Sequence, residues 1–130
     1  MIVLDENILD GQRILLESAS VAPRQIGVDL GRKGLMDEDI IVLLRRQRRI
    51  TFFTRDQDFY NSKLRHRNYC LVVLAVGQYE VAAFVRRFPR HRHFSTQAKR
   101  NGKVARASSS GVSFWETGFA VEQRVMWRSA

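Results

Sequence analysis

Four aspartates carry the oxygen ligands that hard divalent cations prefer, and they lie in three separate segments: Asp5, Asp37, Asp56 and Asp58. Asp5 ends a short apolar run near the start of the chain, and Asp37 opens a helical pattern. Asp56 and Asp58 follow the β-branched and aromatic run 50–54. Carboxylates that converge repel one another unless protons or a cation relieve the repulsion. Such a cluster could bind Mg²⁺ or Mn²⁺ and cleave a phosphodiester with a metal-activated water.

Each aspartate could also have a purely structural role, with no part in metal binding or catalysis. Asp5 could be the N-cap of the helix that follows it, and Asp37 could only complement a helix dipole. Asp56 and Asp58 could be ordinary turn residues. The chain contains no Gly-x-Ser-x-Gly motif, and its single cysteine, Cys70, lies in an apolar run that predicts a buried thiol. Metal-assisted hydrolysis is therefore favoured over covalent catalysis.

The elements that must position these residues alternate between strand and helix patterns. Apolar runs predict strands over residues 1–5, 24–28, 50–54 and 69–76. Helical spacing predicts helices after the first strand, from Asp37 onward and over residues 81–88. This order predicts an α/β fold: a three-layer α/β/α sandwich with a mostly parallel central sheet. Ligands of such sheets bind beyond the carboxyl ends of the strands, where Asp5 and Asp56 should meet.

We expect residues 1–90 or so to form the core of the domain and the C-terminal third to add a hairpin and a tail to it. Residues 104–116 have the pattern of a hairpin with its turn at 109–111, and residues 119–130 could pack on the body or on a partner. Together these segments predict a single domain over residues 1–130. No stretch reaches the 18 or so apolar residues of a membrane span, and no signal-peptide pattern opens the chain. We therefore expect a cytoplasmic protein without a membrane partner.

The formal net charge of +9 is distributed unevenly: residues 1–58 carry −1 and residues 59–130 carry +10. Residues 86–106 contain eight Lys and Arg and no acid, which favours either an RNA contact or a solubilising face. The histidines of this stretch, His91 and His93, predict a solvated or phosphate-facing segment rather than a zinc site. The candidate RNA-backbone contacts are Arg55, Arg86, Arg87, Arg90, Arg92, Lys99 and Arg100.

Three motifs resemble those of PIN-like domains of the small bacterial toxin–antitoxin kind, the VapC-like ribonucleases. The Asp-Glu-Asn at residues 5–7 resembles the end of their first strand, and residues 36–41 resemble their second acidic motif. Residues 54–59 resemble their Thr-Arg-Asp-x-Asp-Phe motif. The spacing, about 30 and then 19 residues, also fits. The resemblance covers roughly residues 1–90, and the hairpin and tail match it less closely.

The resemblance implies a PIN-like sandwich and a Mg²⁺ or Mn²⁺ site whose ligands are Asp5, Asp37, Asp56 and Asp58. It also implies that Glu6 and Asn7 shape the site and that Thr54 hydrogen-bonds a neighbouring carboxylate. No further acidic motif follows residue 58, and Glu80 is the nearest acid after it. The chain departs from the family pattern at this point, and Asp58 is therefore the predicted ligand with the least support.

On this basis the sequence predicts a metal-dependent endoribonuclease, the toxin of a toxin–antitoxin pair. RNA and a small antitoxin protein are its expected partners, and a homodimer is left open. The alternatives are a non-catalytic RNA-binding or antitoxin-binding module with the same fold, and a protein-interaction component whose basic face meets an acidic partner.

Overall fold

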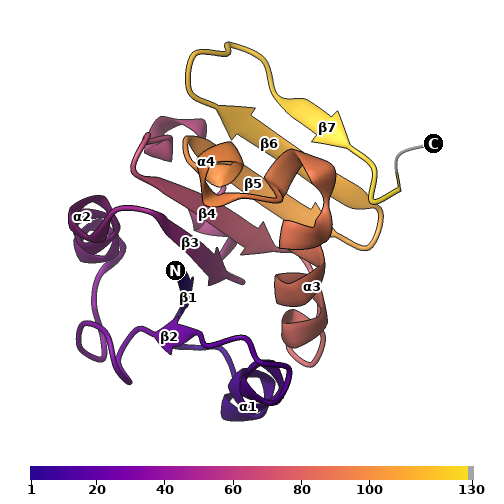
Figure 1. Cartoon of the computed structure of the whole chain (residues 1–130). Helices are drawn as coiled ribbons and strands as arrows, with labels where there is room; N and C mark the ends of the chain where they lie inside the picture. The colour runs from indigo at the N-terminus through magenta and orange to yellow at the C-terminus, as the bar shows by residue number, and fades with distance from the viewer. Residues whose placement is uncertain (129–130) are drawn as a thin grey trace.

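A seven-stranded sheet forms the centre of the computed structural model, which describes residues 1–128 (Figure 1). Its order is β2-β1-β3-β4-β5-β6-β7. The strands β1 to β5 pair in parallel, whereas β6 and β7 join antiparallel. The strands are β1 (Ile2–Leu4), β2 (Arg24–Gln25), β3 (Ile50–Thr54), β4 (Tyr69–Leu74), β5 (Lys103–Ser108), β6 (Gly111–Glu116) and β7 (Gln123–Val125).

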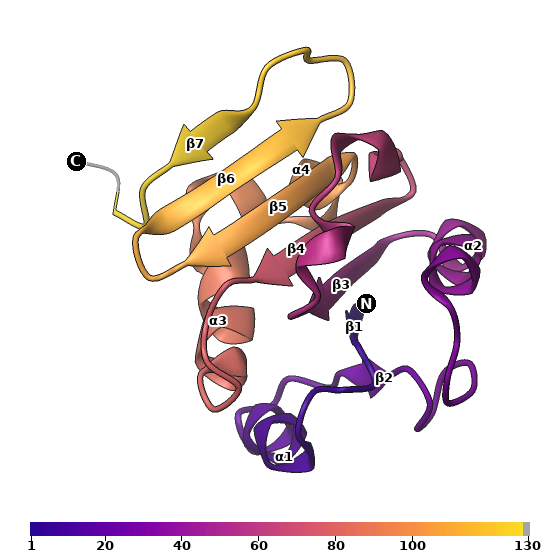
Figure 2. The same ribbon diagram turned by 180° about the vertical axis from the view of Figure 1, so that it is seen from behind.

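Helices cover both faces of the sheet, which confirms the predicted three-layer α/β/α arrangement (Figures 1 and 2). The helices α1, α3 and α4 lie on one face, and α2 lies on the other with two short 3₁₀ turns, η1 and η2. The helical elements are α1 (Asp10–Ser18), α2 (Asp37–Gln47), η1 (Gln57–Phe59), η2 (Ser62–Leu64), α3 (Val81–Arg87), η3 (Phe88–Arg90), η4 (Arg92–Phe94) and α4 (Gln97–Arg100).

Adjacent phenylalanines of β3 show how the sequence builds two cores. Successive strand side chains point to opposite faces, so Phe52 packs on the α2 side and Phe53 on the α3 side. The rings of Phe52 and Phe59 pack edge to face with their centroids 5.6 Å apart, and those of Phe53 and Phe88 do so at 5.9 Å. All residues of β3 and β4 are buried, which explains their continuous apolar runs. Cys70 in β4 is buried as predicted, and burial raises the pKa of its thiol to about 12.

The strand order creates a topological switch point between β1 and β3. The chain leaves β1 through α1 on one face to reach β2, and returns through α2 on the other face to β3. The two connections therefore diverge at the carboxyl ends of these neighbouring strands. In open α/β sheets with the order 2-1-3-4-5, this is where ligands bind.

The predicted C-terminal hairpin is confirmed as β5 and β6, and part of the ambiguous tail packs on the body. β7 extends the sheet beside β6. Beyond it, the Trp127 indole donates a hydrogen bond to the Ser108 carbonyl at 2.6 Å and its ring lies 5.8 Å from Phe84. Residues 129 and 130 of the predicted tail lie outside the described residues.

Two local predictions are wrong. Asp5 does not cap the first helix, because α1 begins later, at Asp10, with Leu9 at its N-cap position. His91 is not a solvated residue: it is buried, and its Nε2 lies 2.6 Å from the carbonyl oxygen of Met126. The prediction relied on the neighbouring arginines in the sequence, whereas in the folded chain the His91 ring lies near Phe94 and Trp127.

Among residues 1–128, no helix has the length and apolar character needed to cross a membrane. The cytoplasmic location stays a prediction.

Candidate active site

Asp5 occupies the carboxyl end of β1 and is buried, with 8% of its surface exposed. Its backbone N–H continues the ladder to β3 by donating to the Phe53 carbonyl at 2.9 Å. Its Oδ1 accepts a hydrogen bond from the Glu6 N–H at 2.8 Å, and its Oδ2 accepts one from the Thr54 hydroxyl at 2.6 Å. Two donors thus hold the carboxylate in one orientation at the switch point.

Thr54 links the first motif to the third. While its hydroxyl donates to Asp5, the same oxygen accepts the Asp56 N–H at 3.0 Å. Asp56 Oδ1 in turn accepts the Asp58 N–H at 3.0 Å and caps the 3₁₀ turn η1. Asp56 and Asp58 therefore also serve as turn residues, and both are exposed.

Asp37 opens α2 as the sequence predicts, with Glu38 and Asp39 beside it in the first turn. Asp37 is exposed, yet partial desolvation raises its pKa, and the charges of Asp56 and Asp5 raise that pKa further. The Asp5 pKa is raised by burial as well, and the Asp56 charge adds to that rise against the two hydrogen bonds. The three motifs therefore come within electrostatic reach of one another. None of the four predicted aspartates forms a salt bridge within residues 1–128.

A cavity of about 270 Å³ opens between the ends of β1 and β3. Its lining residues are Asp5, Asn7, Ile8, Arg55 and Asp56. In the described part of the chain, no group of three or more His, Cys, Asp and Glu side chains is arranged to hold a metal ion. The four aspartates are thus not one tight ligand set, and the metal-binding roles of all four stay predictions.

The donor set nevertheless suits Mg²⁺ or Mn²⁺. Mg²⁺ typically keeps several waters and binds through one or two carboxylates together with substrate phosphates, rather than through a cage of protein ligands. Asp5 and Asp56 provide two carboxylates on one cavity, and Asn7 adds a neutral amide. Each carboxylate oxygen that accepts one hydrogen bond retains a second lone pair.

The loop that carries Asp5 is fastened by Gln25, a buried residue that the sequence analysis did not single out. Its side-chain amide donates to the carbonyls of Asp5 at 3.1 Å and Ile8 at 2.9 Å. Its side-chain oxygen accepts a hydrogen bond from Arg13 at 2.9 Å. A glutamine in a two-residue strand gives no local signal of this role.

Glu6 faces away from the cavity, toward the connection between β2 and α2. Its Oε1 accepts a hydrogen bond from the Gly34 N–H at 2.9 Å. Because that connection leads directly into Asp37, Glu6 is a positioning residue that ties the first motif to the second.

The predicted RNA contacts fall into two groups. Arg87, Lys99 and Arg100 are engaged by the fold: Arg87 lies over the Trp127 ring at 4.4 Å, Lys99 donates to the Arg92 carbonyl at 3.2 Å, and half-buried Arg100 donates to Thr51 at 2.9 Å. Arg87 and Lys99 are nevertheless exposed, and an RNA contact by any of the three stays a prediction. Arg55, Arg86, Arg90 and Arg92 are exposed. Arg55 lines the aspartate cavity and donates to the Val76 carbonyl at 3.0 Å.

Two further exposed arginines, Arg106 and Arg124, were not singled out from the sequence. Arg106 pairs across the sheet with Ser113, and Ser113 pairs with Arg124, so all three side chains share one face in a row. The Arg106 guanidinium donates to Gln57 at 3.1 Å, one residue beyond Asp56. Arg124 donates to Ser113 at 3.1 Å. The alternation within the predicted hairpin could have placed Arg106 on an outward face, whereas β7 was not predicted.

Thr54→Val is expected to weaken Mn²⁺ binding about 10- to 100-fold, because groups that orient metal-binding side chains typically have effects of that size. Valine fills the buried site without the hydroxyl that orients Asp5 and accepts the Asp56 N–H. Calorimetric titration with Mn²⁺ measures the change. Thr54→Ser keeps the hydroxyl and should bind within a few fold of wild type; equal losses in both variants would argue against a role for that hydroxyl.

Comparison of the chain with protein-family models, with curated proteins and with solved structures gives no match. Membership of the PIN-like family therefore rests on the three sequence motifs and stays a prediction. The three motifs lie close together in the folded chain. The motifs at residues 5–7 and 54–59 follow the neighbouring parallel strands β1 and β3. The motif at residues 36–41 opens α2, and the charges of Asp56 and Asp5 raise the pKa of its Asp37.

Proposed function

We propose that this protein is a metal-dependent endoribonuclease that hydrolyses RNA phosphodiesters at the cavity between β1 and β3. One observation carries the proposal: Asp5 and Asp56 line one cavity at the switch point of the sheet and are joined through Thr54, and neither forms a salt bridge within residues 1–128. Because the charge of Asp56 helps to raise the pKa of Asp5, a cation bound between the two carboxylates would stabilise the protein.

Asp5 and Asp56 would hold Mg²⁺ or Mn²⁺, with Asp37 and Asp58 as the further candidates. When bound, the metal supplies an activated water and neutralises charge on the leaving oxygen. Thr54 keeps the Asp5 carboxylate in a fixed orientation, and its own hydrogen bond to the Asp56 N–H fixes the start of η1. Such preorganisation lets the carboxylates act without rearranging during the reaction.

The exposed arginines beside the cavity suit the rest of the RNA strand. Arg55 lines the cavity itself, and the row formed by Arg106 and Arg124 leads away from it across β5, β6 and β7. Guanidinium groups bind phosphates with two parallel hydrogen bonds. Glu122 lies on the same side, and the Tyr60 hydroxyl donates a hydrogen bond to it. The row therefore presents more positive than negative charge.

RNA cleavage in Mn²⁺, with and without EDTA, tests the activity directly. The wild-type chain should cleave a single-stranded RNA in Mn²⁺ and should leave it intact in EDTA. An RNA that stays intact in both conditions, or that is cut equally in both, would contradict the proposal. The toxin–antitoxin role and a homodimer rest on the motifs alone and remain predictions.

Mn²⁺ is expected to raise the Tm of the wild-type chain by roughly 10 °C at one hundred times its Kd, where binding contributes about 2.7 kcal/mol. In EDTA, the raised pKa of Asp5 means that the folded state holds its proton more tightly than the unfolded state. Stability should therefore fall as pH rises from the ordinary Asp pKa through the raised one. The Mn²⁺ effect should grow over the same range.

Differential scanning calorimetry at several pH values measures both trends. Asp5→Asn with Asp56→Asn should abolish the Mn²⁺ shift. A shift that survives in this double variant would place the ion elsewhere.

A further inference from the structure

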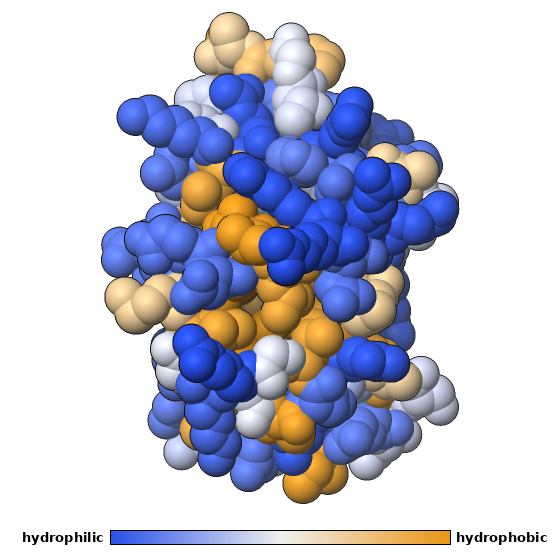
Figure 3. All heavy atoms as spheres, turned by 90° about the vertical axis from the view of Figure 1, so that its left-hand side faces the viewer, coloured by the Kyte–Doolittle hydropathy of each residue, from blue (hydrophilic) through white to orange (hydrophobic). Residues whose placement is uncertain are grey.

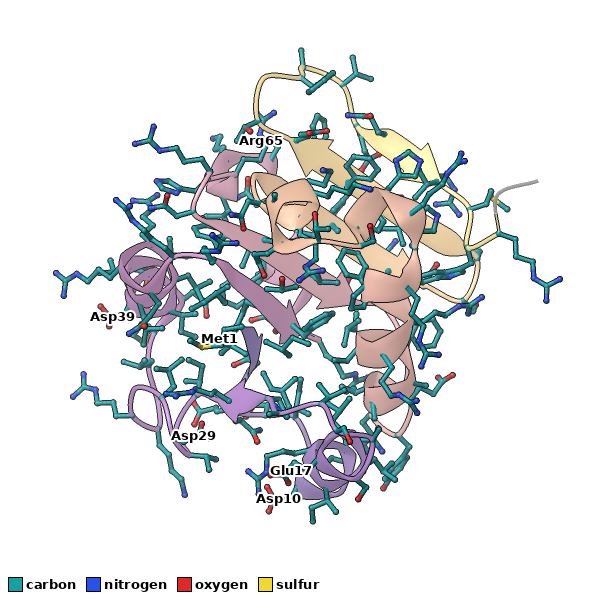
Figure 4. All side chains as sticks on the ribbon, viewed as in Figure 1. Met1, Asp10, Glu17, Asp29, Asp39 and Arg65 are labelled. Atoms are coloured by element: carbon teal, nitrogen blue, oxygen red, sulfur yellow. The ribbon has the colours of Figure 1, made fainter. Side chains whose placement is uncertain are left out.

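Five exposed arginines gather at the amino edge of the sheet, opposite the aspartate cavity: Arg45, Arg46, Arg48, Arg49 and Arg67. They come from the end of α2, the connection to β3 and the connection between η2 and β4. Asn68 joins these segments, because its carbonyl accepts the Arg49 N–H at 2.7 Å and its amide donates to the Arg45 carbonyl at 3.2 Å. Figure 4 shows nitrogen-tipped side chains projecting outward between Asp39 and Arg65.

This amino-edge arginine cluster lacks counter-charges. None of its members forms a salt bridge within the described chain. The carboxylate of Glu116, at the end of β6, pairs with Lys103 at 3.5 Å. The Met1 ammonium, which donates to the Arg49 carbonyl at 3.0 Å, adds another positive charge. Its pKa is lowered by burial and then by the charges of Arg100 and Arg49, as expected for an uncompensated basic surface.

The backbone at the end of α2 adds an independent observation. Arg48 has φ 56° and ψ 156°, and Arg49 also has a positive φ of 54°. Conformations like that of Arg48 are populated almost only by glycine, which is also the residue that most often ends helices. The chain therefore places the Arg48 side chain where the backbone favours a residue without one. Strain of this kind points to a role for the side chain.

We propose that the amino-edge arginine cluster binds the phosphodiester backbone of a nucleic-acid strand, at a site separate from the aspartate cavity. Guanidinium forks match phosphate oxygens, and a row of them along one edge suits a repeating anion. A protein partner would be expected to bury an apolar centre as well. The apolar surface on this side, at Leu35, Val42 and Leu43, belongs to a neighbouring groove, visible as a strip between hydrophilic side chains in Figure 3. Of the five arginines, Arg46 alone lines that groove, and the other four lie outside it.

The test measures binding in EDTA, so it does not depend on whether the chain cleaves RNA. Fluorescence anisotropy of labelled single-stranded RNA, with DNA of the same sequence as a second arm, gives the affinity at several salt concentrations. Arg48→Gly should weaken binding about fivefold near 0.1 M salt and lower the slope of log K against log salt by about 0.7. The same variant should keep or raise the Tm, because glycine relieves the backbone.

Two controls separate this site from general charge. Arg48→Lys keeps the charge and should bind within about twofold of wild type. Arg24→Gln removes one exposed charge from β2, away from the cluster, and should also stay within about twofold. Arg67→Gln, which leaves α2 untouched, should weaken binding as Arg48→Gly does.

Three results would overturn the proposal. These are equal losses in Arg48→Gly and Arg24→Gln, no binding of either nucleic acid, and displacement of the strand by polyglutamate at equal charge concentration. The last result would assign the surface to an acidic protein.

Discussion

Asp56→Asn is expected to reduce Mn²⁺-dependent RNA cleavage by about 10³-fold, equivalent to about 4 kcal/mol of transition-state stabilisation. The asparagine oxygen can still accept the Asp58 N–H and cap η1, so the turn should remain intact. What the substitution removes is one of two carboxylate charges on the cavity. Because Asp56 is exposed, its replacement should change the free energy of unfolding in EDTA by less than about 0.5 kcal/mol.

Asp39→Asn is the matched control. Asp39 is also exposed, lies in the first turn of α2 near the predicted ligand Asp37, and forms no salt bridge within residues 1–128. Rates of cleavage should stay within about threefold of wild type, since both carboxylates that line the cavity remain. Residual cleavage that is identical in wild type and Asp56→Asn would show that the cavity is not the catalytic site.

Gln25→Leu is expected to destabilise the protein by about 3–4 kcal/mol, because two buried carbonyls lose their donor and Arg13 loses its acceptor. Leucine has nearly the same volume, so the effect should come from unsatisfied polar groups rather than from a cavity. One of those carbonyls belongs to Asp5, so cleavage should fall as well. Urea denaturation measures the first effect, and RNA cleavage measures the second.

Gln47→Leu makes the same chemical change on the exposed end of α2 and should alter stability by less than about 0.5 kcal/mol. If both variants unfolded at the same urea concentration as wild type, Gln25 would not be the anchor of the Asp5 loop.

Much of the fold follows from patterns that are local in sequence. The runs at β3 and β4 are continuous because both faces of a parallel strand are covered, and Asp37 starts α2 where acids complement the helix dipole. The convergence of Asp5 and Asp56 follows from one general rule, that neighbouring parallel strands end at the same edge.

The residue roles that could not be predicted from the sequence depend on contacts between distant segments. Gln25 satisfies carbonyls about 20 residues away, and His91 is buried against the Met126 carbonyl 35 residues away. Arg100 donates a hydrogen bond to Thr51, 49 residues away. Residue type and neighbours cannot distinguish such roles, because each depends on where the fold brings a second segment.

The two edge strands of the sheet affect how copies of this chain can associate. β2 at one margin has two residues, and β7 at the other has three, with Arg124 at its centre. Unpaired N–H and C=O groups of a marginal strand template the addition of strands from other molecules, and short or charged margins oppose this. The chain can therefore expose both ends of a seven-stranded sheet with little tendency to grow into a continuous intermolecular sheet, and association between copies should proceed through side-chain surfaces instead.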